Sequence, residues 1–290
     1  MSTKISHVGS VGSVKSDIKR AGQKAAFSPL MEAFERLGYG VRGLIYITMG
    51  LLALAVTLGK GGAPVDPQGA ISAIGGQPAG MVFLWVILIG LVSYSLWGVI
   101  RAVFDPLQKG RDTKGLLVRA GYLISAASYT ILVLYTFGLV SGASSGQSGG
   151  STQKSMASIM STAWGPFVIG ILGVAVIAVG LHQVYQGFNS SFDKQFQSYA
   201  MTAQEVRIAT QLGRFGTAAR GFVLALVGVL VCTAAFQSNS SQPVGFDAAL
   251  TALMRQPYGM WLLGVVAVGL MAFGVYSMVS AAWFRAKSRS

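Results

Sequence analysis

Side chains able to do chemistry are few in this chain of 290 residues, which has nine Asp and Glu, two His and one Cys. A catalytic site usually needs a carboxylate pair, a metal cluster or an activated nucleophile, and no such grouping stands in the sequence. The single cysteine, Cys232, excludes a disulfide within the chain. We therefore expect a protein that is not an enzyme and that uses no metal and no cofactor.

The densest polar patch inside an apolar stretch consists of His182, Gln183 and Gln186. His182 and Gln186 are four residues apart, so they share one face of a helix. Because histidine titrates near neutral pH, this intramembrane patch could contact a polar solute or respond to protons. The alternative, which we favour, is a neutral histidine hydrogen-bonded to a neighbouring helix.

Five arginines recur at related positions and are candidate contacts for lipid headgroups. They are Arg36, Arg42, Arg119, Arg214 and Arg220. A ring of such residues at the cytosolic interface would suit anionic headgroups. Simple anchoring of the helix ends is the plainer interpretation.

A glycine-rich segment, residues 38–43, matches the pattern G-x-G-x-x-G of dinucleotide-binding proteins. In that fold the motif follows a strand and precedes an acidic residue that binds the ribose. Neither feature is present here, so the glycines are better explained by close helix packing.

The composition indicates lipid as the solvent, since 52% of the residues are hydrophobic and only 11% are charged. Six apolar runs have roughly the 20 residues that are needed to cross about 30 Å of hydrocarbon. They cover residues 41–58, 81–100, 121–140, 166–185, 217–236 and 260–279, and none contains an acid. The expected fold is an all-α integral membrane protein with six transmembrane helices.

The distribution of basic residues predicts the orientation. Of the 22 Lys and Arg, only Lys60, Lys154 and Arg255 fall in the loops on one side. By the positive-inside rule, that side is outside and both termini are cytosolic. The net charge of +13 forms no continuous basic face, which argues against a nucleic-acid partner. Residues 1–26 are expected to be a disordered basic cytosolic arm, with an organellar transit peptide as the alternative.

The chain repeats three times. Segments 36–43, 119–126 and 214–221 align on their first arginine, which predicts units at 27–110, 111–195 and 196–290. Each unit crosses the membrane twice, so all three share one orientation and are related by a pseudo-threefold rotation. Gly43 and Gly50 align with Gly221 and Gly228, which predicts close backbone approach between helices. The second unit lacks these glycines.

Shorter helices are expected outside the spans. Amphipathic stretches at 66–74, 151–160 and 246–254 would lie on the outer interface. On the cytosolic side, Thr202 and Glu205 form a capping box, and Ser28-Pro29 is a second helix start. We expect these two helices to lie along the inner surface, through residues 212 and 37, before the chain turns into the membrane.

The chain resembles the bacterial membrane proteins grouped as domain of unknown function 1206. The resemblance rests on the Arg-x-Gly-Tyr openings, the pairs Arg42-Gly43 and Arg220-Gly221, the Gln-Pro-x-Gly segments, residues 90–97 and Asp105-Pro106. It implies a three-repeat fold of six helices in the bacterial cytoplasmic (inner) membrane, and it supplies no reaction.

Two classes of function remain. The first is a structural, lipid-interacting or accessory membrane protein, whose partners would be membrane lipids with anionic headgroups, a second copy or another membrane protein. The second is a passive channel or carrier for a small neutral solute, because a pseudo-symmetric bundle can enclose an axial path. A continuous polar axis would favour conduction, and a close-packed apolar axis would count against it.

Overall fold

The computed structural model describes residues 29–105, 110, 112–143, 158–162, 164–189, 202–237 and 243–283, and all regular structure in these ranges is helical. Six long helices each contain an apolar stretch long enough to span a membrane: α2 (Pro29–Thr57), α4 (Gly80–Phe104), α5 (Thr113–Val140), α7 (Gly165–Asn189), α8 (Ala203–Phe236) and α10 (Gly259–Trp283). The prediction of a six-span, all-helical membrane protein is confirmed. The predicted arm, residues 1–26, lies outside the described ranges.

Two of the spanning helices begin more than ten residues before the apolar runs that mark them in the sequence. Helix α2 begins at Pro29, and α8 begins at Ala203, directly after the capping box of Thr202 and Glu205. The cap is as predicted, but the predicted turns near residues 37 and 212 are wrong, because both helices continue unbroken into the membrane. The 34 residues of α8 extend about 51 Å, well beyond a hydrocarbon layer of about 30 Å.

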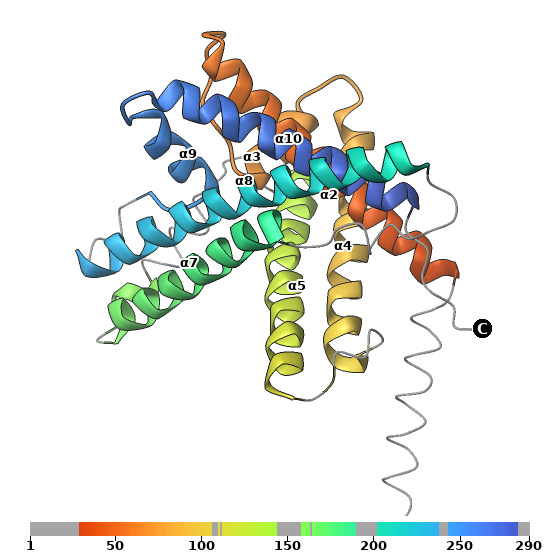
Figure 1. The fold of residues 1–290 in the computed structure, drawn as a ribbon, viewed down its shortest axis with the longest axis horizontal. Coiled ribbons are helices and arrows are strands. Elements are labelled where there is room, and N and C mark those ends of the chain that lie inside the picture. Colours follow the sequence, from red (N-terminus) through yellow and green to blue (C-terminus); the bar gives the residue numbers. More distant parts are fainter. Residues whose placement is uncertain are drawn as a thin grey trace, which may run out of the picture.

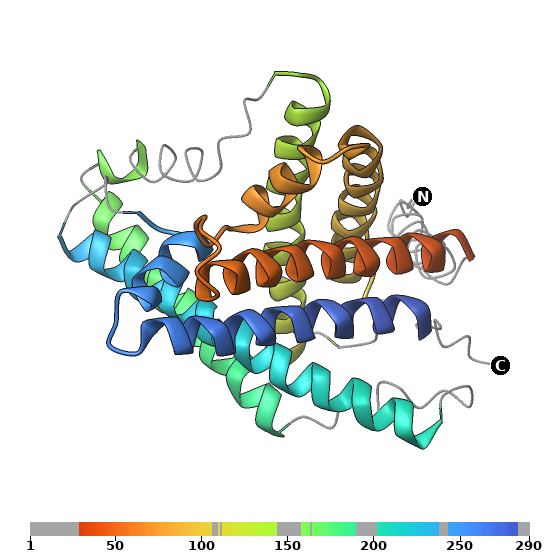
Figure 2. The same cartoon turned by 90° about the horizontal axis from the view of Figure 1, so that it is seen from above.

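The six spans form three close pairs arranged in a ring. The second span of each unit packs against the first span of the next, giving the pairs α4–α5, α7–α8 and α10–α2. The pairs run in three different directions and cross near the middle of the molecule (Figure 1), and Figure 2 shows α2 lying alongside α10. The last span, α10, thus packs on the first span, α2, as a pseudo-threefold arrangement requires.

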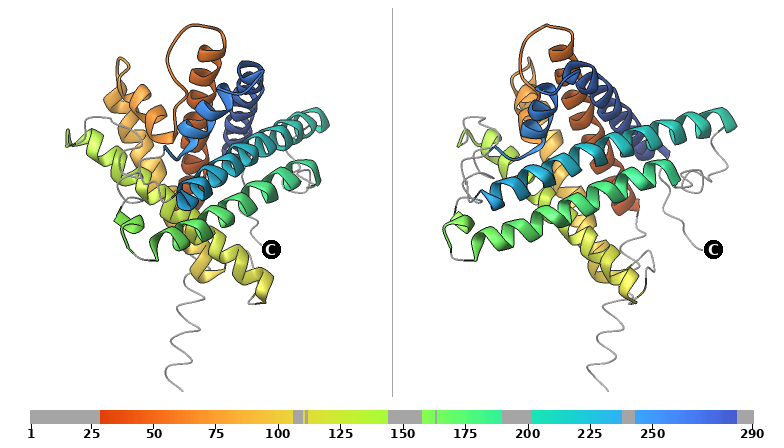
Figure 3. Two further views of the ribbon diagram at one scale, coloured as in Figure 1. Left: turned by 90° about the vertical axis from the view of Figure 1, so that its left-hand side faces the viewer. Right: turned by 60° about the vertical axis from the view of Figure 1, so that its left-hand side comes forward.

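The contact between the two spans of one unit is not the same in all three units. Helices α2 and α4 of the first unit pack on each other, as do α8 and α10 of the third. In contrast, α5 and α7 of the second unit barely touch and lie beside helices of other units (Figure 3).

Glycines allow two of the pairs to approach closely, as predicted. A Cβ atom placed on Gly43 would lie 2.7 Å from the carbonyl oxygen of Gly274 in α10. A Cβ on Gly221 would likewise lie 2.7 Å from the carbonyl oxygen of Gly180 in α7. The α4–α5 pair instead places Gly98 against the Ala126 methyl group, with a Cβ on Gly98 only 2.9 Å away. The predicted difference in packing of the second unit is therefore present.

Two short helices occupy the predicted amphipathic stretches but not the predicted place. They are α3 (Pro67–Gly75) and α9 (Phe246–Met254). Instead of lying on the surface, they insert Ile71 and Leu250, both fully buried, into the main apolar core. Burial between the spans covers more apolar surface than an interfacial position would. Most of the third stretch, 151–160, lies outside the described residues.

The glycine contacts lead to a first prediction. Gly228→Ala should lower the thermal unfolding temperature in detergent, because its Cβ would lie 2.7 Å from the Ile177 backbone nitrogen and 2.8 Å from the Gly173 carbonyl oxygen. Overpacking of this kind costs about 1–3 kcal/mol.

Gly121→Ala is the matched control, since nothing lies within 4 Å of its Cβ position. Both substitutions have the same intrinsic effect on helix propensity. Equal unfolding temperatures for the two variants would contradict the packing explanation.

Candidate functional site

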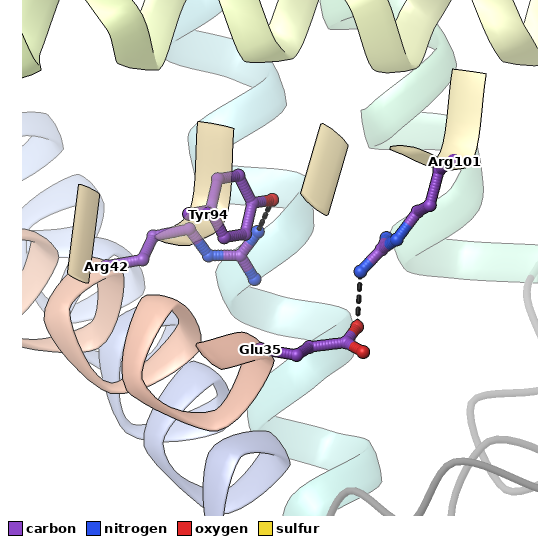
Figure 4. Close-up of polar contacts among 4 residues, drawn as sticks. All are labelled: Glu35, Arg42, Tyr94 and Arg101. Carbon is purple, nitrogen blue, oxygen red and sulfur yellow. Dashed lines mark hydrogen bonds and ion pairs between the residues drawn. The ribbon is translucent and has the colours of Figure 1, made fainter. Parts of the chain in front are cut away.

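Arg42, in the middle of α2, points into the bundle and joins three helices. Its Nη1 donates to the Tyr94 hydroxyl of α4 at 3.0 Å (Figure 4). Its Nε and Nη2 donate to the Ser277 hydroxyl of α10, at 3.3 and 3.1 Å. The guanidinium is therefore held by two neutral hydroxyl groups.

Arg220, the equivalent residue of the third unit, points into the bundle from α8. Its Nε donates to the Tyr46 hydroxyl of α2, and its Nη1 donates to the Gln183 side-chain oxygen of α7, both at 2.7 Å. This arginine also joins three helices, and its partners are again neutral.

Aromatic rings bring the two arginines together. The guanidinium carbons of Arg42 and Arg220 lie 4.9 and 5.1 Å from the centre of the Phe273 ring. The two charges are thus at most about 10 Å apart, where like charges repel by about 2 kcal/mol at an effective dielectric constant of 20. Cation–π contacts with Tyr39, at 4.7 Å from Arg42, and with Tyr46, at 5.5 Å from Arg220, offset part of this cost. We call Arg42, Arg220 and these neighbours the arginine centre.

No carboxylate of the described chain balances these charges. Seven of the nine acids are described, and they cap or flank helices or pair with other arginines: Glu32, Glu35, Asp66, Asp105, Asp112, Glu205 and Asp247. A guanidinium has five N–H groups, of which Arg42 uses three and Arg220 two in the bonds given above. An uncompensated cation at this depth costs several kcal/mol, so the centre is suited to an anion.

A second buried charge cluster lies beside the centre, between α2 and α4. Arg101 pairs with the buried carboxylate of Glu35 (Figure 4), and its guanidinium carbon lies 4.9 Å from the Trp97 ring centre. The prediction that no acid lies in a span is wrong here, because α2 starts earlier than its apolar run. Glu35, Tyr39, Arg42 and Tyr46 stand at intervals of four, three and four residues, and this helical spacing could have revealed the shared face.

The five predicted headgroup arginines do not form one ring. Arg42 and Arg220 point inward, as described. Arg36 pairs with Glu32 of its own helix at 2.8 Å, while Arg119 donates to the carbonyl oxygens of Ala102 and Val103 at the end of α4, at 2.7 and 3.2 Å. Arg214 is exposed. Aligned positions thus have different surroundings, because the residues packed around each unit differ.

The predicted polar patch on α7 is divided between two faces. Gln183 turns inward and accepts the hydrogen bond from Arg220. His182 and Gln186 are exposed, and their Nε2 atoms lie 3.0 Å apart. The expectation that His182 bonds to a neighbouring helix is wrong, since its partner is one turn along the same helix.

Comparison with known proteins gives a family and one relative. The family model described as Domain of Unknown Function (DUF1206) matches three times, at residues 37–105, 120–190 and 215–283. The chain is also 32% identical over 256 residues to the uncharacterized protein YxxB of Bacillus subtilis (strain 168), an alignment covering 88% of this chain and 92% of that protein. No solved structure matches.

The Glu35–Arg101 pair yields a second prediction. Glu35→Gln should lower the thermal unfolding temperature strongly, because it leaves the Arg101 charge buried without its carboxylate. Loss of one member of a buried pair costs about 3–5 kcal/mol. The double variant Glu35→Gln with Arg101→Gln should recover part of the loss.

Glu32→Gln is the control, since it breaks a partly exposed pair of the same type on the same helix. Such pairs contribute about 0.3–0.5 kcal/mol. Similar unfolding temperatures for Glu32→Gln and Glu35→Gln would refute the assigned role.

Proposed function

The chain belongs to the DUF1206 family, whose name assigns no activity, and from that premise we propose that it binds the headgroup of an anionic lipid inside its helix bundle and catalyses no reaction. The proposal rests on one observation: two partly buried guanidinium groups point into the bundle and have only neutral hydrogen-bond partners in the described chain. A phosphate group would supply the missing charge and accept the remaining N–H groups. Arginine suits this task because its planar fork binds phosphate through two bonds.

The depth of the arginine centre agrees with a headgroup ligand. Arg42 stands 15 residues before the end of α2 at Thr57, and Arg220 stands 16 residues before the end of α8 at Phe236. At about 1.5 Å per residue, both lie about 22–24 Å from the outer ends of their helices. In a hydrocarbon layer of about 30 Å, this is close to the headgroups of the inner leaflet.

The location that goes with this function is the bacterial cytoplasmic membrane, with both termini in the cytosol. The supporting observations are the excess of Lys and Arg in alternate loops and the bacterial relative. In this orientation the exposed Arg214 faces the same leaflet as the arginine centre.

The other candidate, a passive channel or carrier, has no observation in its favour. The side chains of Met49, Ile71, Leu250 and Leu263 are fully buried in the apolar core on the outer side of the arginine centre. A close-packed apolar core of this kind counts against a path for a neutral solute. A polar site closed on its outer side suits binding better than conduction.

Removal of both central arginines provides the third prediction. The double variant Arg42→Gln with Arg220→Gln should bind anionic phospholipid about tenfold more weakly or worse, because hydrogen bonds to charged groups contribute about 1.5–3 kcal/mol. Native mass spectrometry of protein released from phosphatidylglycerol-containing nanodiscs measures the fraction that retains lipid. Folding should survive, since the substitution removes uncompensated charge.

Arg214→Gln is the matched control, an exposed arginine at an aligned position. Arg42→Lys with Arg220→Lys should retain an intermediate fraction, because lysine keeps the charge and loses the fork. Equal lipid retention by the double glutamine variant, Arg214→Gln and the unchanged protein would exclude the proposed site.

A further inference from the structure

The second unit is open where the other two units are closed. The two spans of the first and third units pack on each other, but α5 and α7 barely touch and run in different directions (Figures 1 and 3). They are also the two least buried of the six spans. Both expose large apolar side chains along their length, among them Ile131 and Leu134 on α5 and Ile171 and Val174 on α7.

The same two helices border the arginine centre. Gln183 of α7 accepts a hydrogen bond from Arg220, and the Tyr129 ring of α5 lies 4.3 Å from the ring of Tyr94, which binds Arg42. Each of these two helices therefore carries both exposed apolar side chains and one side chain that borders the arginine centre.

The second unit also lacks the third arginine. Arg42, Ser125 and Arg220 are each the sixth residue of their family match, so they hold equivalent positions. Two units thus contribute a cation to the centre, whereas the second unit has a short hydroxyl side chain at the equivalent position on α5. Ser125 therefore lies in α5, a helix that does not pack closely on the other span of its own unit.

We propose that an anionic phospholipid reaches the centre sideways, from the inner leaflet, between α5 and α7. Its phosphate binds Arg42 and Arg220, and its acyl chains lie against the exposed apolar side chains of the two helices. Charge complementarity selects this ligand, because an apolar tail alone would gain nothing over bulk lipid, and a free anion would make no use of the apolar faces. This inference rests on the proposed function and specifies the route and the ligand class.

Photo-crosslinking tests the position of the acyl chain. An anionic phospholipid carrying a diazirine in its acyl chain is incorporated into nanodiscs with the full-length protein, irradiated and mapped by peptide mass spectrometry. Adducts on residues 113–140 and 165–189 should exceed those on residues 80–104 and 259–283 severalfold. This excess should disappear in the Arg42→Gln, Arg220→Gln variant and with a phosphatidylcholine probe of the same chain.

A second experiment adds bulk to the side chain at position 125 of α5. Ser125→Trp should lower the retention of anionic lipid about fivefold or more, because the indole adds bulk to α5 at the position equivalent to Arg42 and Arg220. Ser128→Trp, at an exposed serine one turn along the same helix, should leave retention unchanged. Unchanged retention in Ser125→Trp would overturn the route.

The outcomes separate this inference from the function on which it rests. If lipid retention depends on Arg42 and Arg220 but the adducts fall equally on all spans, the headgroup site stands and the sideways route is wrong. If phosphatidylglycerol and phosphatidylcholine probes give the same adducts in the unchanged protein, charge does not select the ligand and the inference fails. If lipid retention does not depend on Arg42 and Arg220, both proposals fail.

Discussion

Lipid gives helices no hydrophobic reason to associate, so the bundle depends on the close backbone contacts that glycine permits. Gly43 against Gly274 holds α2 to α10, and Gly221 against Gly180 holds α8 to α7. In both cases the residue just before the first glycine is an arginine. The Arg-Gly dipeptide therefore couples two effects, because the contact that fixes a helix pair also carries the neighbouring charge into the bundle.

The second unit shows what happens without this dipeptide. Ser125-Ala126 replaces it, and α5 meets α4 through the Ala126 methyl group against Gly98. The pair still forms, but no charge enters the centre from this side, and α5 and α7 stay apart. The replacement of Arg-Gly by Ser-Ala thus accounts for one departure from threefold symmetry, the missing cation.

Features that depend on position along the chain were predictable from the sequence, whereas the neighbours that each side chain meets in another helix were not. Hydropathy reveals the six spans, and the repeat reveals which glycines are equivalent. The hydropathy of Arg42 or Arg220 is the same whether the side chain points to a headgroup or to Phe273. Burial of Glu35 was missed for a related reason, since the apolar run begins at residue 41 whereas the helix begins at Pro29, about three turns earlier.

Two other wrong predictions concern what packs against a side chain, which the sequence of one segment does not reveal. The amphipathic pattern of α9 predicts an apolar face but cannot say whether lipid or protein covers it, and Leu250 turns out to be covered by protein. His182 and Gln183 are adjacent in sequence, yet they face opposite surroundings because helical neighbours point about 100° apart. In each case the answer comes from the helix packed alongside.

The composition of the core bears on binding against transport. Fully buried apolar side chains such as Met49 and Leu263 belong to the same core as Tyr46 and Phe273, which contact the arginines. A conduit needs polar groups throughout its length, weak enough in affinity to release what passes. A binding site needs a strong charge that its neighbours do not cancel, and two guanidiniums held by neutral hydroxyl and amide groups are of that kind. Tyrosine and glutamine fix the geometry of these cations and leave their charge uncancelled, which a carboxylate in the same place would not.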